Sequence, residues 1–117
     1  MKLLAVIFLL GTSPMAMAFV NLENCSGDRL TTLENCVNDN FTAIARGVDH
    51  VELDFRLCTA LDNLNLPDFA NCVNDNFSEV KKAFPRLNLP RCHATTTMSP
   101  GLINCINDNF VKVQYQF

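Results

Sequence analysis

The six cysteines, at positions 25, 36, 58, 72, 92 and 105, are the residues best suited to chemistry in this sequence. Thiols can join in disulfides, hold a metal ion or act as nucleophiles. A zinc site typically needs closely paired ligands such as Cys-x-x-Cys, and no such pair occurs here. In an oxidising compartment an even number of cysteines predicts disulfides. Because only a thiolate is a nucleophile, we expect three disulfides and no reactive cysteine.

The remaining residues offer little to an enzyme or to a bound ion. His50 and His93 are the two histidines, and the sequence contains no serine-hydrolase, zinc-protease or phosphate-loop motif. Asp39, Asp75 and Asp108 each stand between two asparagines, but a calcium loop also needs a glycine and a distal glutamate at fixed positions. We therefore expect a non-enzymatic protein without cofactor or metal, with these aspartates facing solvent.

Residues 1–18 have the layout of a secretory signal peptide. Lys2 precedes the apolar run 3–10, and Ala-Met-Ala ends at Ala18. The apolar run is too short to span a bilayer, which takes roughly 20 residues. We expect cleavage after Ala18 and one secreted, extracellular domain of residues 19–117 without a transmembrane segment.

The charge of the chain also limits its partners. Its net charge is −3 over 117 residues, and removal of Lys2 would leave eight bases against twelve acids. Nucleic-acid binding generally depends on a basic surface that releases counterions. The acidic balance argues against nucleic acid and against a cationic, membrane-lytic mode of action.

A seven-residue motif, Asn-Cys-Val/Ile-Asn-Asp-Asn-Phe, occurs at residues 35–41, 71–77 and 104–110. Successive copies are 36 and 33 residues apart, which indicates an internal repeat. One further cysteine precedes each copy, so the repeats run approximately over 19–47, 48–85 and 86–117. Six cysteines permit fifteen pairings, and we favour pairing within each repeat: Cys25–Cys36, Cys58–Cys72 and Cys92–Cys105.

Helical periodicity surrounds each copy of the motif. At about 100° per residue, Phe69, Val73 and Val80 fall on one face of a helix, whereas Asn71 and Asn74 fall on the opposite face. Start signals agree with this interpretation: Thr31 with Glu34 has the pattern of a capping box, and Ser99 followed by Pro100 is a typical helix start.

We also expect a central helix at residues 49–63, since that stretch is apolar on two sides at helical spacing and Asp49 with Glu52 has the pattern of another capping box. The predicted fold class is all-α: a small disulfide-stapled bundle of four or five helices built from three sequence repeats. Its expected core includes Phe41, Phe55, Val73, Phe77 and Phe110.

One asparagine of each motif is expected inside the protein. Asn40, Asn76 and Asn109 lie in the middle of the apolar helix face, where an unpaired amide would cost roughly 1–3 kcal/mol. We expect backbone groups of the segment leading into each repeat to bind them. Asn40 and Asn76 also begin glycosylation sequons, as does Asn24. A glycan must reach water, so we favour a structural role for Asn40 and Asn76 and leave Asn24 open.

The first three cysteines resemble the start of a known family. Ten residues separate Cys25 from Cys36 and 21 separate Cys36 from Cys58, with helix-favouring Leu30 and Leu33 between. This pattern is similar to that of microplusin-like arthropod proteins, secreted six-cysteine helical antimicrobials that sequester copper. The resemblance covers about a third of the chain and implies a defence role and an all-helical fold. The later cysteine spacings differ and the histidine-rich ends are missing, so no copper ligand is carried over.

These observations favour a secreted, non-enzymatic effector of the venom-toxin or host-defence type that binds an extracellular protein, receptor or microbial target. Two alternatives stay open. An extracellular carrier would hold a small apolar ligand among the many Phe and Leu side chains, and a structural or matrix-associated protein would use the repeats for assembly.

Overall fold

The computed structural model describes residues 20–26, 29–59, 66–94 and 98–117. The signal peptide expected at residues 1–18 lies outside this part of the chain. Three α-helices are present in the described ranges, α2 (Leu30–Gly47), α4 (Leu66–Ala83) and α5 (Pro100–Gln114), and these ranges contain no strand. The all-α prediction is confirmed for these ranges, which contain three helices where four or five were expected for the whole domain.

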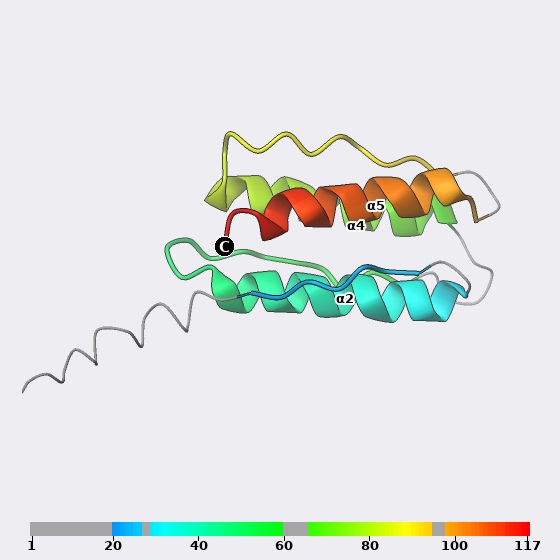
Figure 1. Cartoon of the computed structure of the whole chain (residues 1–117), viewed down its shortest axis with the longest axis horizontal. Helices are drawn as coiled ribbons and strands as arrows, with labels where there is room; N and C mark the ends of the chain where they lie inside the picture. Colours follow the sequence, from blue (N-terminus) through cyan, green and yellow to red (C-terminus); the bar gives the residue numbers. More distant parts are fainter. Residues whose placement is uncertain (1–19, 27–28, 60–65, 95–97) are drawn as a thin grey trace, which may run out of the picture.

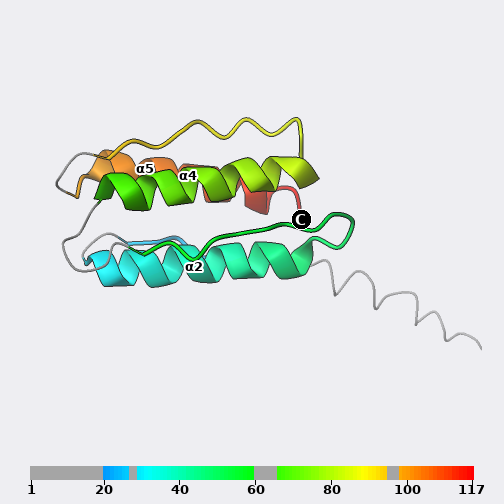
Figure 2. The ribbon, with the colours of Figure 1, turned by 180° about the vertical axis from the view of Figure 1, so that it is seen from behind.

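The three helices run in the same direction, and the chain returns between them in non-helical segments (Figure 1). We call these segment 1 (20–26), segment 2 (51–59) and segment 3 (87–94). Each one runs antiparallel to the helix that follows it in sequence. Figure 2 shows segment 2 passing between α2 and α4. The layout explains how one cysteine before each helix reaches the cysteine inside that helix.

The predicted central helix at 49–63 is wrong in its described part, because residues 52–59 have no regular secondary structure; residues 60–63 lie outside the described ranges. Val51, Leu53 and Phe55 are partly buried and pack on the core, while Glu52 and Asp54 between them are exposed. This two-residue alternation is typical of an extended chain with one face on a core.

Capping residues and charged side chains account for several of the helix ends. Ser99 caps α5 by accepting a hydrogen bond from the Leu102 N–H at 3.3 Å, with Pro100 at the first helical position. The capping box expected at Thr31 does not form, because α2 begins at Leu30 with Arg29 as its N-cap and no side-chain cap. All three last turns carry basic residues that oppose the partial negative charge of a helix C-terminus: Arg46, Lys81, Lys82 and Lys112.

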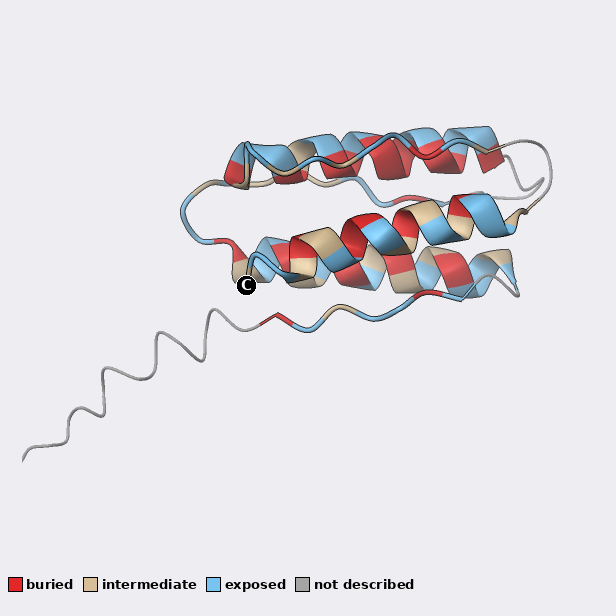
Figure 3. Ribbon diagram, turned by 45° about the horizontal axis from the view of Figure 1, so that its top comes forward, coloured by how far each residue is buried: buried red, intermediate tan, exposed pale blue. Residues whose placement is uncertain are grey.

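The inner faces of the three helices meet along a common core, which Figure 3 shows as inward-facing buried residues. Phe41, Phe77 and Phe110, the last residues of the three motif copies, form a closed triangle. Their ring centroids are 5.0, 5.0 and 4.9 Å apart, and Phe55 adds a fourth ring 5.0 Å from Phe41. Such tilted contacts are favourable beyond area burial alone, and they fill the axis of the bundle.

Each segment is joined to the helix that follows it by one disulfide. The three disulfides are Cys25–Cys36, Cys58–Cys72 and Cys92–Cys105. These are the pairs favoured from the repeat pattern. All three have a Cα–Cα distance of 5.6 Å, inside the usual range for a disulfide. Within the described ranges no helix combines the length and apolarity that a membrane span requires.

Candidate functional site

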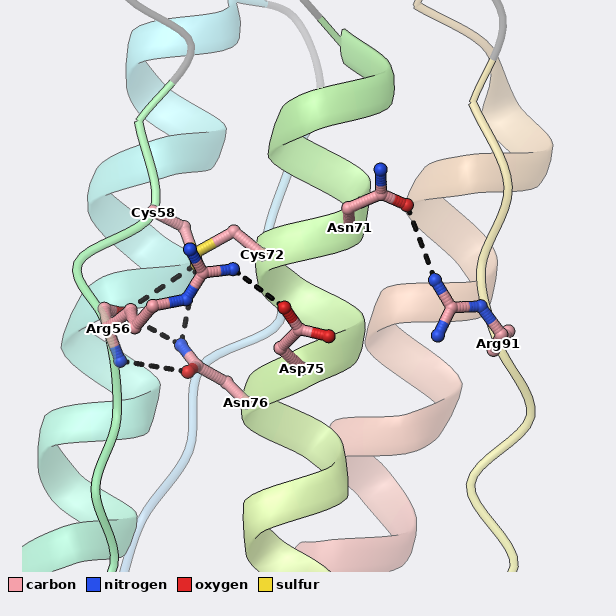
Figure 4. A network of polar contacts seen from close by, with 7 residues as sticks. All are labelled: Arg56, Cys58, Asn71, Cys72, Asp75, Asn76 and Arg91. Carbon is pink, nitrogen blue, oxygen red and sulfur yellow. Dashed lines mark hydrogen bonds and ion pairs between the residues drawn. A yellow bond between two sulfur atoms is a disulfide. The ribbon is translucent and has the colours of Figure 1, made fainter.

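Each motif's third asparagine binds the backbone of the segment that precedes its own helix; we call this the own-repeat clamp. Asn76 accepts a hydrogen bond from the Arg56 N–H at 2.9 Å and donates one to the Arg56 carbonyl at 2.8 Å (Figure 4). Asn40 binds Glu23 through the same two bonds, both 2.9 Å long. The segments lack ladder partners, so these amides satisfy backbone groups that a sheet would otherwise pair.

The amide group is the right chemistry for this position. The Asn76 nitrogen also lies 3.4 Å from the Cys58 sulfur, and Asn40 makes the equivalent contact with Cys25 at 3.6 Å. An aspartate has no N–H to donate and would bury a charge. Both amides are at most 2% exposed. Both side chains are buried and hydrogen-bonded, as expected for a structural role, and each side-chain nitrogen is already engaged by a carbonyl and a sulfur.

The third copy departs from the other two at Pro90, which takes the place of Glu23 and Arg56. Asn109 is 1% exposed and donates to the Pro90 carbonyl at 2.9 Å. Proline has no backbone N–H, so the second bond of the clamp cannot form with this residue. Its own-repeat clamp is therefore weaker than the other two.

The motif's second asparagine binds a different segment, and we call this the neighbour clamp. Asn38 on α2 binds the backbone N–H and carbonyl of Cys58, and Asn74 on α4 does the same for Cys92. Asn107 on α5 completes the set with Cys25, 82 residues away in sequence. All six bonds are 2.7–2.9 Å long.

The two kinds of clamp close the molecule into a ring. Each segment is held on one side by its own helix, through a disulfide and an own-repeat clamp, and on the other side by the preceding helix. Segment 1 has no preceding helix in sequence, and α5 takes that place. The neighbour clamp was missed from the sequence: Asn74, expected on the solvent face, is only 4% exposed. Its identity in all three copies was the available signal.

The remaining candidate residues lie at the surface. Asp39, Asp75 and Asp108 are exposed, and Asp75 forms an ion pair with Arg56 at 2.7 Å (Figure 4). His50 and His93 are exposed too. The described ranges contain no cluster of three or more His, Cys, Asp or Glu side chains suited to a metal ion.

The candidate binding site is a groove between segment 1 and α5, which we call the segment 1 groove. It has a volume of about 200 Å³. Its lining residues are Leu22, Glu23, Asn24, Asn107, Phe110, Val111, Gln114 and Tyr115. Gln114 fixes one wall by accepting from the Leu22 N–H at 2.6 Å. Glu23 is the one charged residue in this lining; the amides of Asn24, Asn107 and Gln114 are polar, and the other four residues are apolar or aromatic.

Two exposed apolar residues line this groove, Val111 near the end of α5 and Tyr115 at its C-cap. Tyr115 is 80% exposed and Val111 is 49% exposed, and they stand one helical turn apart. The first and second motif copies have Thr42 and Ser78 at the position of Val111. They have basic residues, Arg46 and Lys82, at the position of Tyr115. Because the other two copies have polar or charged residues at these positions, the helical repeat itself does not require an apolar pair here.

The groove between segment 2 and α2 is built in the same way and differs in chemistry. It has a volume of about 390 Å³ and includes Phe41 and Asn38, the counterparts of Phe110 and Asn107. Three charged residues line it: Arg46, Asp54 and Arg56. Equivalent grooves therefore present different side chains on the same arrangement of segment and helix.

The chain matches no protein-family model, no curated protein and no solved structure.

Proposed function

We propose that this protein is a secreted, non-enzymatic effector of the venom or host-defence type, which binds an extracellular protein target through the segment 1 groove. The observation that carries the proposal is the exposed pair Val111 and Tyr115 beside that groove. Tyrosine is enriched among the residues that dominate binding energy at protein interfaces. It buries a large area with few rotatable bonds and so loses little entropy.

The restraints on the backbone of segment 1, which forms one side of the groove, support this proposal. Disulfides, own-repeat clamps and neighbour clamps hold the backbone of segment 1 from two helices. A surface that is already ordered loses less entropy on binding. Secretion is consistent with three intramolecular disulfides.

The negative charge of Glu23 favours a partner with a basic group at the matching position. Its carboxylate is the one charged group in a groove otherwise lined by apolar, aromatic and amide side chains. A complementary surface would place an apolar or aromatic side chain against Val111 and Tyr115, with a lysine or arginine near Glu23. The carrier alternative has less support, because the Phe41, Phe77 and Phe110 rings fill the bundle axis.

The test compares oxidised protein with a variant that gives α5 the surface of α2. The purified protein is applied in a dose series to bacterial and fungal cultures and to excitable cells, with growth and ionic currents as readouts. We expect a dose-dependent effect in one system, and a loss of at least tenfold in potency for V111T/Y115R. The matched control, T42S/R46K on α2, should keep wild-type potency.

Two results would contradict the proposal. One is an absence of effect in every system, and the other is equal potency of V111T/Y115R and the wild type. An apolar fluorescent dye that binds saturably at one site, and is displaced by fatty acids, would favour the carrier function instead. Circular dichroism checks that both variants keep the helical fold.

A further inference from the structure

We propose that Asn24 is the glycosylated asparagine of this protein, alone among its three sequons. The ligand is an N-linked oligosaccharide, added during passage through a secretory pathway that modifies Asn-x-Ser/Thr. The proposal depends on the secretion included in the proposed function. It does not depend on the identity of the target.

The Asn24 side chain is open to solvent. Asn24 and Ser26 are exposed, while Cys25 between them is 1% exposed and bonded to Cys36. The residue just before the upstream cysteine is exposed in the other two segments as well, as Leu57 and Arg91. The ring architecture therefore turns this position to solvent, and Cys25 can form its disulfide while Asn24 carries a bulky group.

The asparagines of the other two sequons are buried and hydrogen-bonded. The amides of Asn40 and Asn76 use their nitrogens to bind backbone carbonyls and cystine sulfurs. A sugar on either nitrogen would break the own-repeat clamp and place a polar group in the core. A chain modified there cannot adopt this fold. Within the described ranges no hydrogen bond holds the Asn24 side chain, so its modification breaks none.

Glycosylation of Asn24 is a group transfer. The side-chain nitrogen of Asn24 forms a bond to the anomeric carbon of an oligosaccharide carried on a lipid diphosphate. The bond between that carbon and the diphosphate oxygen breaks, and the diphosphate leaves with the electron pair. The asparagine nitrogen loses one proton, and nothing is oxidised or reduced. Because Asn24 also lines the segment 1 groove, the glycan would stand at its edge.

The test is site-specific mass spectrometry on protein secreted from mammalian cells that express the full chain. Enzymatic removal of N-glycans in ¹⁸O-water converts each glycosylated asparagine into an ¹⁸O-labelled aspartate. We expect the label at Asn24 and none at Asn40 or Asn76 in folded, oxidised protein. Ser26→Ala should abolish the glycan while leaving Asn24 in place. Val111→Thr, which completes a sequon at buried Asn109, should add none.

The outcomes separate this proposal from the proposed function. Secreted protein without label at Asn24, or with label at Asn40 or Asn76 in the folded fraction, overturns the glycosylation proposal and leaves secretion standing. Failure of the full chain to reach the medium contradicts secretion. In that case residues 19–117 are placed behind an established secretory leader, and the same Asn24 peptide decides the glycosylation proposal.

Discussion

At the residue scale, the clamping asparagines of the motif supply the backbone hydrogen bonds that a neighbouring strand would supply in a sheet. Each of the six clamping amides binds main-chain groups of a segment that has no ladder partner of its own. A carboxylate cannot replace them, since the nitrogen donates to a carbonyl or a sulfur. This requirement explains why the two clamping asparagines of the motif are identical in all three copies, whereas the third motif residue is Val in two copies and Ile in the other.

The unequal own-repeat clamps give a direct prediction. Asn76→Ala removes two hydrogen bonds to Arg56 and should lower the free energy of unfolding by about 3 kcal/mol; Asn109→Ala removes one bond to Pro90 and should cost about 2 kcal/mol. Urea unfolding of the oxidised proteins measures both. The control Asn71→Ala, at an exposed position of α4, should stay within about 0.5 kcal/mol of the wild type. Equal costs for the two buried asparagines would contradict the assigned hydrogen bonds.

A second prediction concerns acid. The Asp54 N–H, which donates to the Glu79 carboxylate at 3.0 Å, and then Lys82, at 2.9 Å, lower the pKa of Glu79 from its usual 4.5. A lowered folded-state pKa stabilises the fold above the unfolded-state pKa, and the contribution is lost as pH falls through the folded-state value. The stability difference between wild type and Glu79→Gln should therefore shrink between about pH 6 and about pH 2. Urea titrations across that range measure it, and a constant difference would argue against the shift.

At the element scale, the motif helices and the disulfide pairs could be predicted from the sequence, but segment 2 could not. Helices α2, α4 and α5 follow from apolar spacing, and the pairs follow from one upstream cysteine per repeat. The stretch 49–59, which contains segment 2, combines Asp49 and Glu52 in the pattern of a capping box with apolar residues on two sides of a helical wheel. Val51, Leu53 and Phe55 also alternate with polar residues, and this shorter period is the one that the core selects.

The prediction that Asn74 faces solvent was wrong for a related reason. A wheel drawn for a single helix gives it one apolar face. In the ring, each helix contacts two other helices and two segments, so a wider arc is buried. The faces next to the segments need hydrogen-bonding groups and not apolar ones, because they meet backbone. Asn74 is buried against the Cys92 backbone for this reason.

The disulfide that links segment 2 to α4 gives the element-scale prediction. Cys58 and Cys72 are 14 residues apart. In the chain-entropy model, removing a disulfide that closes a loop of this size lowers the free energy of unfolding by roughly 3 kcal/mol. The double variant C58A/C72A should therefore unfold at a clearly lower urea concentration while keeping its helical circular dichroism. An unchanged midpoint would mean that the clamps alone restrain segment 2.

At the scale of the whole molecule, the ring closes through contacts between the first and last described parts of the chain. Asn107 holds Cys25, and Gln114 holds Leu22. A close approach at the end of α2 adds to this: a side chain at Gly47 would collide with Val20. Segment 1 thus depends on residues about 80–90 positions away, and the segment 1 groove exists only when the ring is closed.

Hydrogen exchange can test that dependence. Asn107→Ala should speed exchange of the Cys25 amide and, if segment 1 detaches as a unit, also of the Leu22 and Glu23 amides, by about tenfold or more. The Arg56 amide, held by Asn76, serves as an internal control and should keep its protection. Faster exchange at Cys25 alone would mean that the ring stays closed without this clamp.

The most direct measurement of the closed ring is a set of nuclear Overhauser effects among selectively labelled phenylalanine rings. Phe41, Phe77 and Phe110 come from three different helices, and their centroids are about 5 Å apart in every pair. We predict cross-peaks for all three pairs in the oxidised protein. The absence of any one pair would contradict the closed arrangement of three helices and three returning segments.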